Sequence, residues 1–245
     1  HQHHAFDCYL GDDMCCIVSG IGKLNSAAAT AWIAALNQQS PSIAWINIGT
    51  AGSASQTIGS LWWINKITDV ESSRRTYPVP LIASPCPSVH CLTHNQVDSE
   101  YHPQFLSDME ASAFFDTATR FSSAELVHCL KVVSDNKDTP CVKDKNKVSQ
   151  LIQQNMVSID SFSQAVKQLT QQLSQTAIAE TDWQRFLSKA HFSQTQSSQL
   201  RNCLVYLLSQ NDSVDTLMAD IEMLDSSNAI LEFLNQRRLD RSRNL

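Results

Sequence analysis

Hydrophobic and polar positions follow two different patterns along this chain. Up to about residue 140, short apolar runs end in glycine or polar residues, as is typical of buried strands that lead into helices. Beyond residue 141 the chain contains neither glycine nor proline, and apolar residues recur at steps of three and four. The sequence therefore predicts an α/β domain followed by an all-helical part.

Four apolar runs in the first part are predicted as strands. They are Met14–Val18, Ile43–Ile48, Leu61–Ile67 and Leu126–Val133. Helices are predicted over residues 23–36 and 107–121. In the third strand, Trp62 and Trp63 should point to opposite faces because side chains alternate along a strand. Strands that alternate with helices predict an α/β fold, with a mainly parallel or mixed sheet flanked by helices.

The helical part opens with an amphipathic helix that is expected to close the α/β domain. Its apolar stripe consists of Ile159, Phe162, Val166, Leu169 and Leu173. The polar stretch over residues 174–181 is expected to be a linker. Four further helices are predicted over residues 183–190, 193–208, 214–224 and 229–239. Ser193 and Gln196 form a predicted capping box at the start of the second one. We therefore divide the chain into an α/β domain (residues 1–175) and a helical appendage (residues 176–245).

Composition narrows the classes of function. The net charge of −6 argues against nonspecific binding to nucleic acid, which favours a basic surface. No apolar run approaches the roughly 20 residues that a membrane-spanning helix needs. The eight cysteines are scattered, which favours free thiols in a reducing compartment and predicts a cytoplasmic protein.

One group of metal-ligand residue types does not predict a metal site. It consists of Cys86, His90, Cys91, His94 and His102. Their spacing matches no standard zinc site, and Pro85 and Pro87 indicate a loop. We expect neither a metal nor a cofactor.

Four short motifs lie at predicted strand–helix junctions. They are Gly20-Ile-Gly-Lys-Leu-Asn25, Asn47-Ile-Gly-Thr-Ala-Gly52, Asp108-Met-Glu-Ala111 and Val133-Ser-Asp-Asn136. In this order they resemble the nucleoside phosphorylase/nucleosidase superfamily, whose members cleave the N-glycosidic bond of purine nucleosides. The resemblance covers roughly residues 5–175. In motif it is closest to the nucleosidases that act on methylthioadenosine and S-adenosylhomocysteine.

The resemblance implies roles for two carboxylates. Asp135 would be the acid that hydrogen-bonds or protonates the purine at N7, and Ser134 beside it would take part in substrate binding. Glu110 would accept hydrogen bonds from the ribose 2′- and 3′-hydroxyls, to which two carboxylate oxygens are suited, and Met109 would pack on the sugar. From the residues alone, Asp135 also suits a turn after a strand. Ser107 and Glu110 equally suit a capping box.

The glycine-rich motif would line the ribose and the nucleophile. Thr50, Ala51 and Gly52 are expected to bind there through backbone N–H groups, although an ordinary tight turn is the alternative. Related phosphorylases commonly carry arginine where this chain has Asn47, which indicates water rather than phosphate as the nucleophile. The first motif lacks the spacing of a Walker phosphate loop, so Lys23 is expected to be structural.

The chain departs from the family pattern at two places. The family's hydrolases open with a strand and a glutamate that activates water, whereas residues 1–13 resemble the region that follows them. We therefore expect either a longer gene product or a protein without that carboxylate. The base-stacking aromatic is also not assigned, with Tyr77 and Tyr101 as candidates.

Three functional hypotheses remain open at this point. The first is hydrolysis of a purine nucleoside, and the second is phosphate-dependent cleavage. The third is a non-catalytic nucleoside-binding or scaffold module whose helical appendage binds a protein partner. Since family members commonly assemble, a homo-oligomer is expected.

Overall fold

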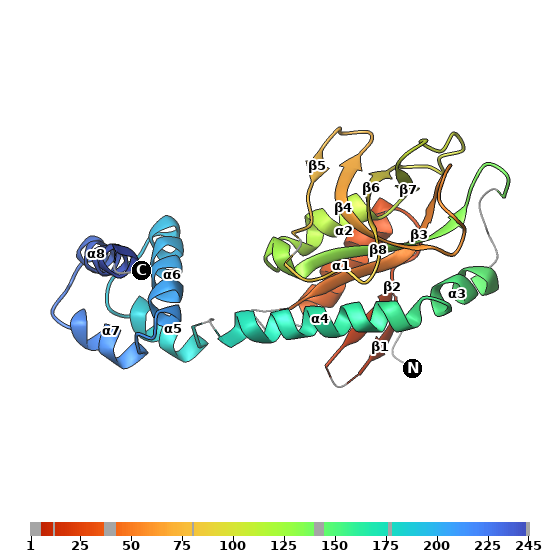
Figure 1. Cartoon of the computed structure of the whole chain (residues 1–245). Helices are drawn as coiled ribbons and strands as arrows, with labels where there is room; N and C mark the ends of the chain where they lie inside the picture. Colours follow the sequence, from red (N-terminus) through yellow and green to blue (C-terminus); the bar gives the residue numbers. More distant parts are fainter. Residues whose placement is uncertain are drawn as a thin grey trace. The chain divides into compact units, whose positions relative to one another are not determined.

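The computed structural model describes residues 6–11, 13–36, 43–79, 81–139, 145–175 and 178–243. The chain divides into two compact units, residues 1–171 and 172–245 (Figure 1). The first unit contains all the strands of the described residues, and the second contains helices alone. Whether residues 1–175 fold without the rest stays a prediction.

A six-stranded mixed sheet forms the centre of the first unit. Its order is β5 (Arg75–Thr76), β4 (Leu61–Asp69), β6 (Ser88–Thr93), β7 (Leu106–Asp108), β3 (Trp45–Gly52) and β8 (Val127–Asp135). Strand β4 also pairs with β8, so all the strands except β5 close into a ring. The β3–β8, β4–β6 and β6–β7 pairs are parallel, whereas β3–β7 and β4–β8 are antiparallel. The predicted α/β fold with a mixed sheet is confirmed.

Helices lie against the sheet (Figure 1). They pack on it through two separate apolar clusters. Helices α1 (Lys23–Leu36) and α2 (Ala111–Ala118) pack on one side, with Ala51, Cys129 and Val133 of the sheet. Helices α3 (Lys145–Gln153) and α4 (Met156–Gln175) pack on the other, with Leu130 and Val132. The strand β8 thus sends alternate side chains into the two clusters. A short 3-10 helix (Ala124–Leu126) precedes this strand.

The apolar stripe of α4 is buried as predicted except at Leu173, which is partly buried. Ile159, Phe162, Val166 and Leu169 are at most 8% exposed. Trp62 packs against the α1–α2 cluster and Trp63 lies in the α3–α4 cluster, which confirms that they point to opposite faces.

The first predicted strand lies outside the main sheet. Strand β2 (Cys15–Val18) pairs with β1 (Asp7–Leu10) in an antiparallel two-stranded sheet of its own. Cys15 and Ile17 are partly buried, whereas Cys16 and Val18 are exposed. The prediction of a fully buried strand was therefore wrong, because an apolar run does not tell a strand with one covered face from one with two.

Two boundaries near the candidate site also differ from the prediction. Strand β3 continues to Gly52, so Gly49–Gly52 is extended strand and not a tight turn. The predicted helix over residues 107–121 overlaps strand β7 (Leu106–Asp108), and α2 covers only Ala111–Ala118. Hydrogen bonds of Ser107 and Asp108 to other segments, described below, hold this part of the chain in the sheet.

The second unit contains four helices around its own core. They are α5 (Glu180–Leu187), α6 (Gln194–Ser209), α7 (Val214–Asp220) and α8 (Ser227–Arg243). The four predicted helices are confirmed, although α7 ends earlier than expected. The capping box of Ser193 and Gln196 is present at α6. Within the described residues, no helix combines the length and apolar character needed to cross a membrane.

Candidate active site

An ion pair between Asp108 of β7 and Lys131 of β8 connects two strands that both pair with β3. Lys131 Nζ is 2.8 Å from Asp108 Oδ2, and both side chains are sealed from solvent. Lys131 stands opposite Gly49 in the register of β8 and β3, where a Cβ atom would come within 3.0 Å of Nζ. Glycine at position 49 therefore leaves the room that the lysine chain occupies.

Each partner keeps the other charged. Burial alone would lower the pKa of Lys131, but the carboxylates of Asp108 and Glu110 outweigh it and raise this pKa well above its ordinary value. Burial likewise opposes ionisation of Asp108, yet Lys131 and the Thr93 hydroxyl hold its pKa below the usual range. Thr93 Oγ1 donates to Asp108 Oδ1 at 2.7 Å, and the Ala111 N–H donates to Oδ2 at 2.8 Å. Asp108 therefore also holds the first amide of α2.

Glu110 is fixed from two sides. Its Oε1 accepts a hydrogen bond of 2.8 Å from the Gly22 N–H, and its Oε2 lies 3.8 Å from Lys131 Nζ. Gly22 has φ +97°, a left-handed conformation that favours glycine. Because α1 begins at Lys23, the carboxylate also lies at a helix N-terminus, where the helix dipole attracts negative charge. The capping-box alternative for Ser107 and Glu110 was wrong, because Ser107 lies in β7 and its hydroxyl donates to Asp98, while α2 begins only at Ala111.

Asp135 ends β8 and accepts hydrogen bonds from two hydroxyl groups. Tyr101 Oη donates to Oδ2 at 2.8 Å, and Ser134 Oγ donates to Oδ1. Gly52 is the register partner of Asp135. A Cβ atom at Gly52 would come within 2.5 Å of the Tyr101 ring and 2.8 Å of Asp135 Oδ2. The glycine therefore permits a close-packed Tyr101–Asp135 pair in which Asp135 is 9% exposed.

Strand β7 brings the two carboxylate regions together. Gly52, the last residue of β3, pairs with Ser107, which precedes Asp108 in β7. Met109 and Glu110, both partly buried, follow directly, while Thr50 and Ala51 lead along β3 to Gly52. The predicted substrate-binding residues from the Met109, Gly52 and Asp135 segments thus gather around one junction of strands. Along β8, Asp135 lies four residues beyond Lys131, roughly 13 Å in an extended strand.

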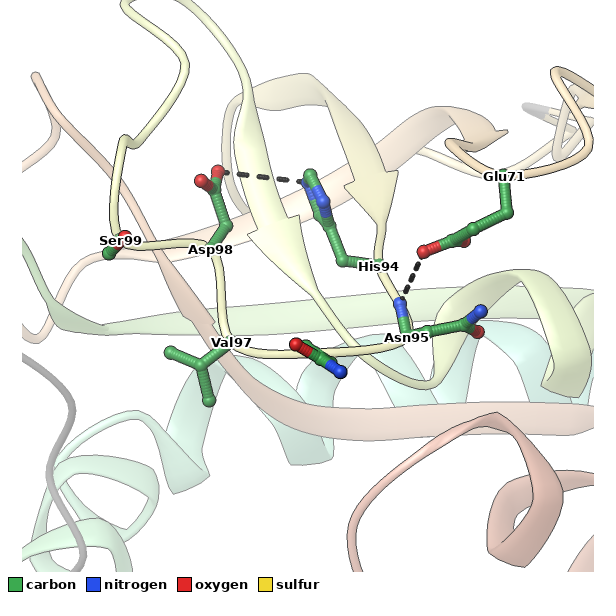
Figure 2. Close-up of a pocket in the computed structure, with 7 residues that line it drawn as sticks. Glu71, His94, Asn95, Val97, Asp98 and Ser99 are labelled. Carbon is green, nitrogen blue, oxygen red and sulfur yellow. Dashed lines mark hydrogen bonds and ion pairs between the residues drawn. The ribbon is translucent and has the colours of Figure 1, made fainter.

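An open hollow with a volume of about 440 Å³ borders this junction (Figure 2). It is lined by Glu71 and residues 94–99 of the loop between β6 and β7. Asp98, in its wall, accepts hydrogen bonds from the Ser107 hydroxyl at 2.7 Å and from the Tyr101 N–H at 3.3 Å. Figure 2 shows His94 beside Asp98, where their side chains are 3.7 Å apart. Asp98 therefore connects the hollow with both β7 and Tyr101.

Lys23, His90 and Tyr77, which the sequence analysis also considered, contact other side chains of the protein. Lys23 forms ion pairs with Asp69 and Glu71, which agrees with the structural role expected of it. His90 shares a hydrogen bond of 2.8 Å with Thr68, and burial lowers the pKa of this histidine to about 4. Tyr77 is 58% exposed, with Lys66 above its ring.

Within the described ranges, the thiols and the metal-ligand residue types form no metal site. No group of three or more His, Cys, Asp or Glu side chains there is arranged to hold a metal ion. Seven of the eight cysteines lie in these ranges and are free thiols, with Cys8 Sγ and Cys15 Sγ 3.3 Å apart. Cys141 lies outside them.

Solved structures resemble this chain in fold at low sequence identity. Isoform 2 of uridine phosphorylase from Schistosoma mansoni is 11% identical and superposes with a TM-score of 0.50, over 66% of this chain and 74% of its own. At this identity the likeness shows the fold alone, and that fold is phosphorylase-like. A methylthioadenosine/S-adenosylhomocysteine nucleosidase from Colwellia psychrerythraea, solved with adenine, is 18% identical with a TM-score of 0.47, over 61% of this chain and 77% of its own. No protein-family model matches the sequence, and no curated protein matches it either.

Sequence reasoning missed Asp108 and Lys131, although both gave a signal. Lys131 is a single charge within the apolar run Leu130–Val133, and a charge in a buried strand needs a partner. Asp108 belongs to the same motif as Met109 and Glu110 but was given no role. The hydrogen bond from Tyr101 to Asp135 had no sequence signal, since the two residues are 34 positions apart.

Proposed function

We propose that this protein cleaves the N-glycosidic bond of a purine nucleoside by hydrolysis. In this proposal Asp135 is the acid that protonates the purine base at N7, and Glu110 accepts hydrogen bonds from the ribose 2′- and 3′-hydroxyls. Met109 packs on the sugar, and Thr50, Ala51 and Gly52 line the ribose and the nucleophile. Ser134 orients the Asp135 carboxylate through its hydroxyl.

The observation that carries the proposal is the meeting of two carboxylate-bearing segments at the end of β3. The pairing of Gly52 with both Ser107 and Asp135 places the Glu110 segment and the acid around one glycine. A nucleoside needs such a separation of tasks, because its leaving base and its sugar hydroxyls lie on different sides of the bond that breaks. Loss of the base creates an oxocarbenium-like sugar, for which a positioned acid and a nearby negative charge are both useful.

The surroundings of Glu110 favour a binding role over a structural one. The Gly22 N–H and the Lys131 ammonium group fix its two oxygens, and the side chain is still 17% exposed. A carboxylate that is held in place and yet reaches solvent can accept hydroxyl protons without losing side-chain entropy on binding. Asp108, by contrast, is completely enclosed and serves to neutralise Lys131.

Water is preferred over phosphate as the nucleophile because of Asn47. This residue lies in β3 two positions before Gly49, where the resemblance implies an arginine in phosphorylases. An amide carries no charge to offset that of phosphate, whereas an arginine would bind it through paired hydrogen bonds.

A second candidate function is nucleoside binding without turnover. The observation that favours it is the closed Tyr101–Asp135 pair, in which both oxygens of the proposed acid already accept hydrogen bonds. In that case the helical unit would act as the binding surface for a protein partner. Assembly into a homo-oligomer is a further expectation, to be measured by light scattering.

Base release is the experiment that tests the proposal. Methylthioadenosine, S-adenosylhomocysteine, adenosine and inosine are each incubated with the protein, with and without phosphate. Base release without phosphate would support hydrolysis if Asp135→Asn abolishes it. Asp138→Asn, which alters an exposed acid in the following turn, is the control and should keep the activity. Strict dependence on phosphate would instead favour a phosphorylase. Binding of adenine without any release would favour the second candidate.

Glu110→Gln tests the ribose contact separately. The amide oxygen keeps an acceptor for the Gly22 N–H, while the negative charge that the diol needs is removed. We expect kcat/KM to fall roughly 10- to 100-fold, the usual effect of losing a hydrogen bond to a charged group. An unchanged kcat/KM would contradict the assigned role of Glu110.

A further inference from the structure

The Tyr101 hydroxyl occupies a hydrogen-bonding position on Asp135, the acid of the proposed function. Its hydroxyl donates to Asp135 Oδ2 at 2.8 Å, and its ring lies against Gly52. The ring is 5% exposed, so this arrangement is packed rather than a loose contact at the surface.

No atom fits between the phenol and the carboxylate. At 2.8 Å the two oxygens are in direct hydrogen-bond contact. Both side chains also pack so closely on Gly52 that a methyl group would not fit there. A purine nitrogen therefore cannot take the position that the phenol oxygen holds on Asp135 Oδ2 while Tyr101 is in place. The base and the phenol compete for that position.

The backbone at Tyr101 shows that this position is held under strain. Its φ of +50° lies in the left-handed region, which a bulky side chain rarely adopts. Asp98 supports the strained residue by accepting hydrogen bonds from the N–H groups of Tyr101 and Glu100. Release of the phenol would let the backbone relax, and the hollow lined by Asp98 borders the loop that would move (Figure 2).

We propose that Tyr101 is an internal competitor for the base, which determines how readily the site admits a purine. The phenol takes the hydrogen-bonding position of the base on Asp135, and the site opens when Tyr101 turns away. This inference rests on the proposed function of Asp135. The apparent affinity for a purine is then the affinity of the open form reduced by the fraction of molecules that are open.

Adenine binding to Tyr101→Phe tests the inference. Phenylalanine keeps the ring but removes the hydroxyl, so the closed form loses one hydrogen bond to a charged group. We expect adenine to bind about 10- to 100-fold more tightly by titration calorimetry, with a lower melting temperature of the unliganded protein. Tyr77→Phe, which removes a hydroxyl from an exposed ring, is the matched control and should change neither value.

The outcomes separate this inference from the proposed function. Equal or weaker binding by Tyr101→Phe, with binding lost in Asp135→Asn, would overturn the role of Tyr101 and leave that of Asp135. A failure of all the variants and the parent protein to bind adenine would overturn both.

A second measurement uses the unaltered protein. Nitration of Tyr101 by tetranitromethane, read by peptide mass spectrometry, should increase when adenine is added, because the base displaces the buried phenol. Protection of Tyr101 by adenine would overturn the inference, since it would show that the ring covers the base instead of leaving it.

Discussion

Lys131 and Asp108 form a solvent-inaccessible ion pair of 2.8 Å, and Asp108 stands two positions before Glu110 in the sequence. Such a pair adds little stability compared with apolar residues, because removing both charges from water costs most of what their attraction returns. Breaking it is different, since one charge is then left buried alone. The pair therefore makes the position of Glu110 depend on two residues that would not touch a substrate.

Replacing Lys131 tests this dependence. We expect Lys131→Met to lower the free energy of unfolding by about 3–5 kcal/mol, because Asp108 keeps a buried charge without a partner. Urea unfolding followed by tryptophan fluorescence measures the change. Lys167→Met, which breaks an exposed ion pair with Asp13, is the control and should cost less than about 1 kcal/mol. Adding Asp108→Asn to Lys131→Met should restore part of the lost free energy of unfolding, because the buried carboxylate charge is then removed. No recovery in the double variant would contradict this explanation.

The same pair sets the pH range of stability. The folded pKa of Asp108 is lowered, so its contribution is present above its unfolded value of about 3.9 and is lost as pH falls further. The folded pKa of Lys131 is raised, so its contribution is present below about 10.4 and is lost at higher pH. We expect a plateau of stability from about pH 4 to 10 from this pair. In the Lys131→Met, Asp108→Asn double variant, the losses of stability at low and at high pH that come from this pair should be absent. Identical pH profiles of the double variant and the parent protein would contradict this prediction.

His128 should make stability fall within a milder range of acidity. It is enclosed in β8 with its ring edge-on to Phe162, and burial lowers its pKa to about 4 against a smaller opposing effect of the Glu125 backbone. Between pH 6.5 and 4 the unfolded chain binds more protons, so the folded state loses up to about 3 kcal/mol as pH falls. His128→Phe should flatten this part of the urea-midpoint profile. Some dependence of stability on pH should remain in this variant, because the pKa of His90 is lowered in the same way. A urea-midpoint profile as steep as that of the parent protein would contradict the prediction.

Glycines 49 and 52 should respond differently to an added methyl group. Neither has a positive φ, so alanine is excluded by contacts and not by backbone conformation. In Gly52→Ala the Cβ would overlap the Tyr101 ring and the Asp135 carboxylate, and we expect base release to fall roughly 100-fold through misplacement of the acid. In Gly49→Ala the nearest atom is the end of a lysine chain at 3.0 Å, so stability should suffer more than activity. Parallel assays of kcat and urea midpoint check both, and equal effects on kcat would argue against the site at Gly52.

Much of the fold could be predicted because it follows from local patterns. The stripe on α4 and the runs that became β4 and β8 each show their burial in the spacing of apolar residues alone. Strands β6 and β7 could not be recognised in this way. Leu106–Asp108 is short and polar, and it belongs to the sheet because Ser107 binds Asp98 and Asp108 binds Lys131. Such contacts join distant parts of the sequence and leave no periodic signal.

The candidate site shows the same division. Asp135 and Glu110 were named as candidates from the family-like motifs Val133-Ser-Asp-Asn136 and Asp108-Met-Glu-Ala111. Their surroundings could not be predicted, since Gly22 and Tyr101 reach them across 88 and 34 residues. Tyr101 was considered only as a ring to stack on a base, and the structure instead joins its hydroxyl to the proposed acid.

The two units should fold independently of each other. The core of the second unit consists of residues from α5 to α8, and the buried stripe of α4 that serves the first unit ends at Leu169. Truncation after Gln175, the last residue of α4, therefore removes no side chain of the first unit's clusters. We expect a soluble product whose near-ultraviolet dichroism and urea midpoint match those of the first unit in the whole chain. An insoluble or molten product would contradict this prediction, because it would show that residues 176–245 complete the α/β domain.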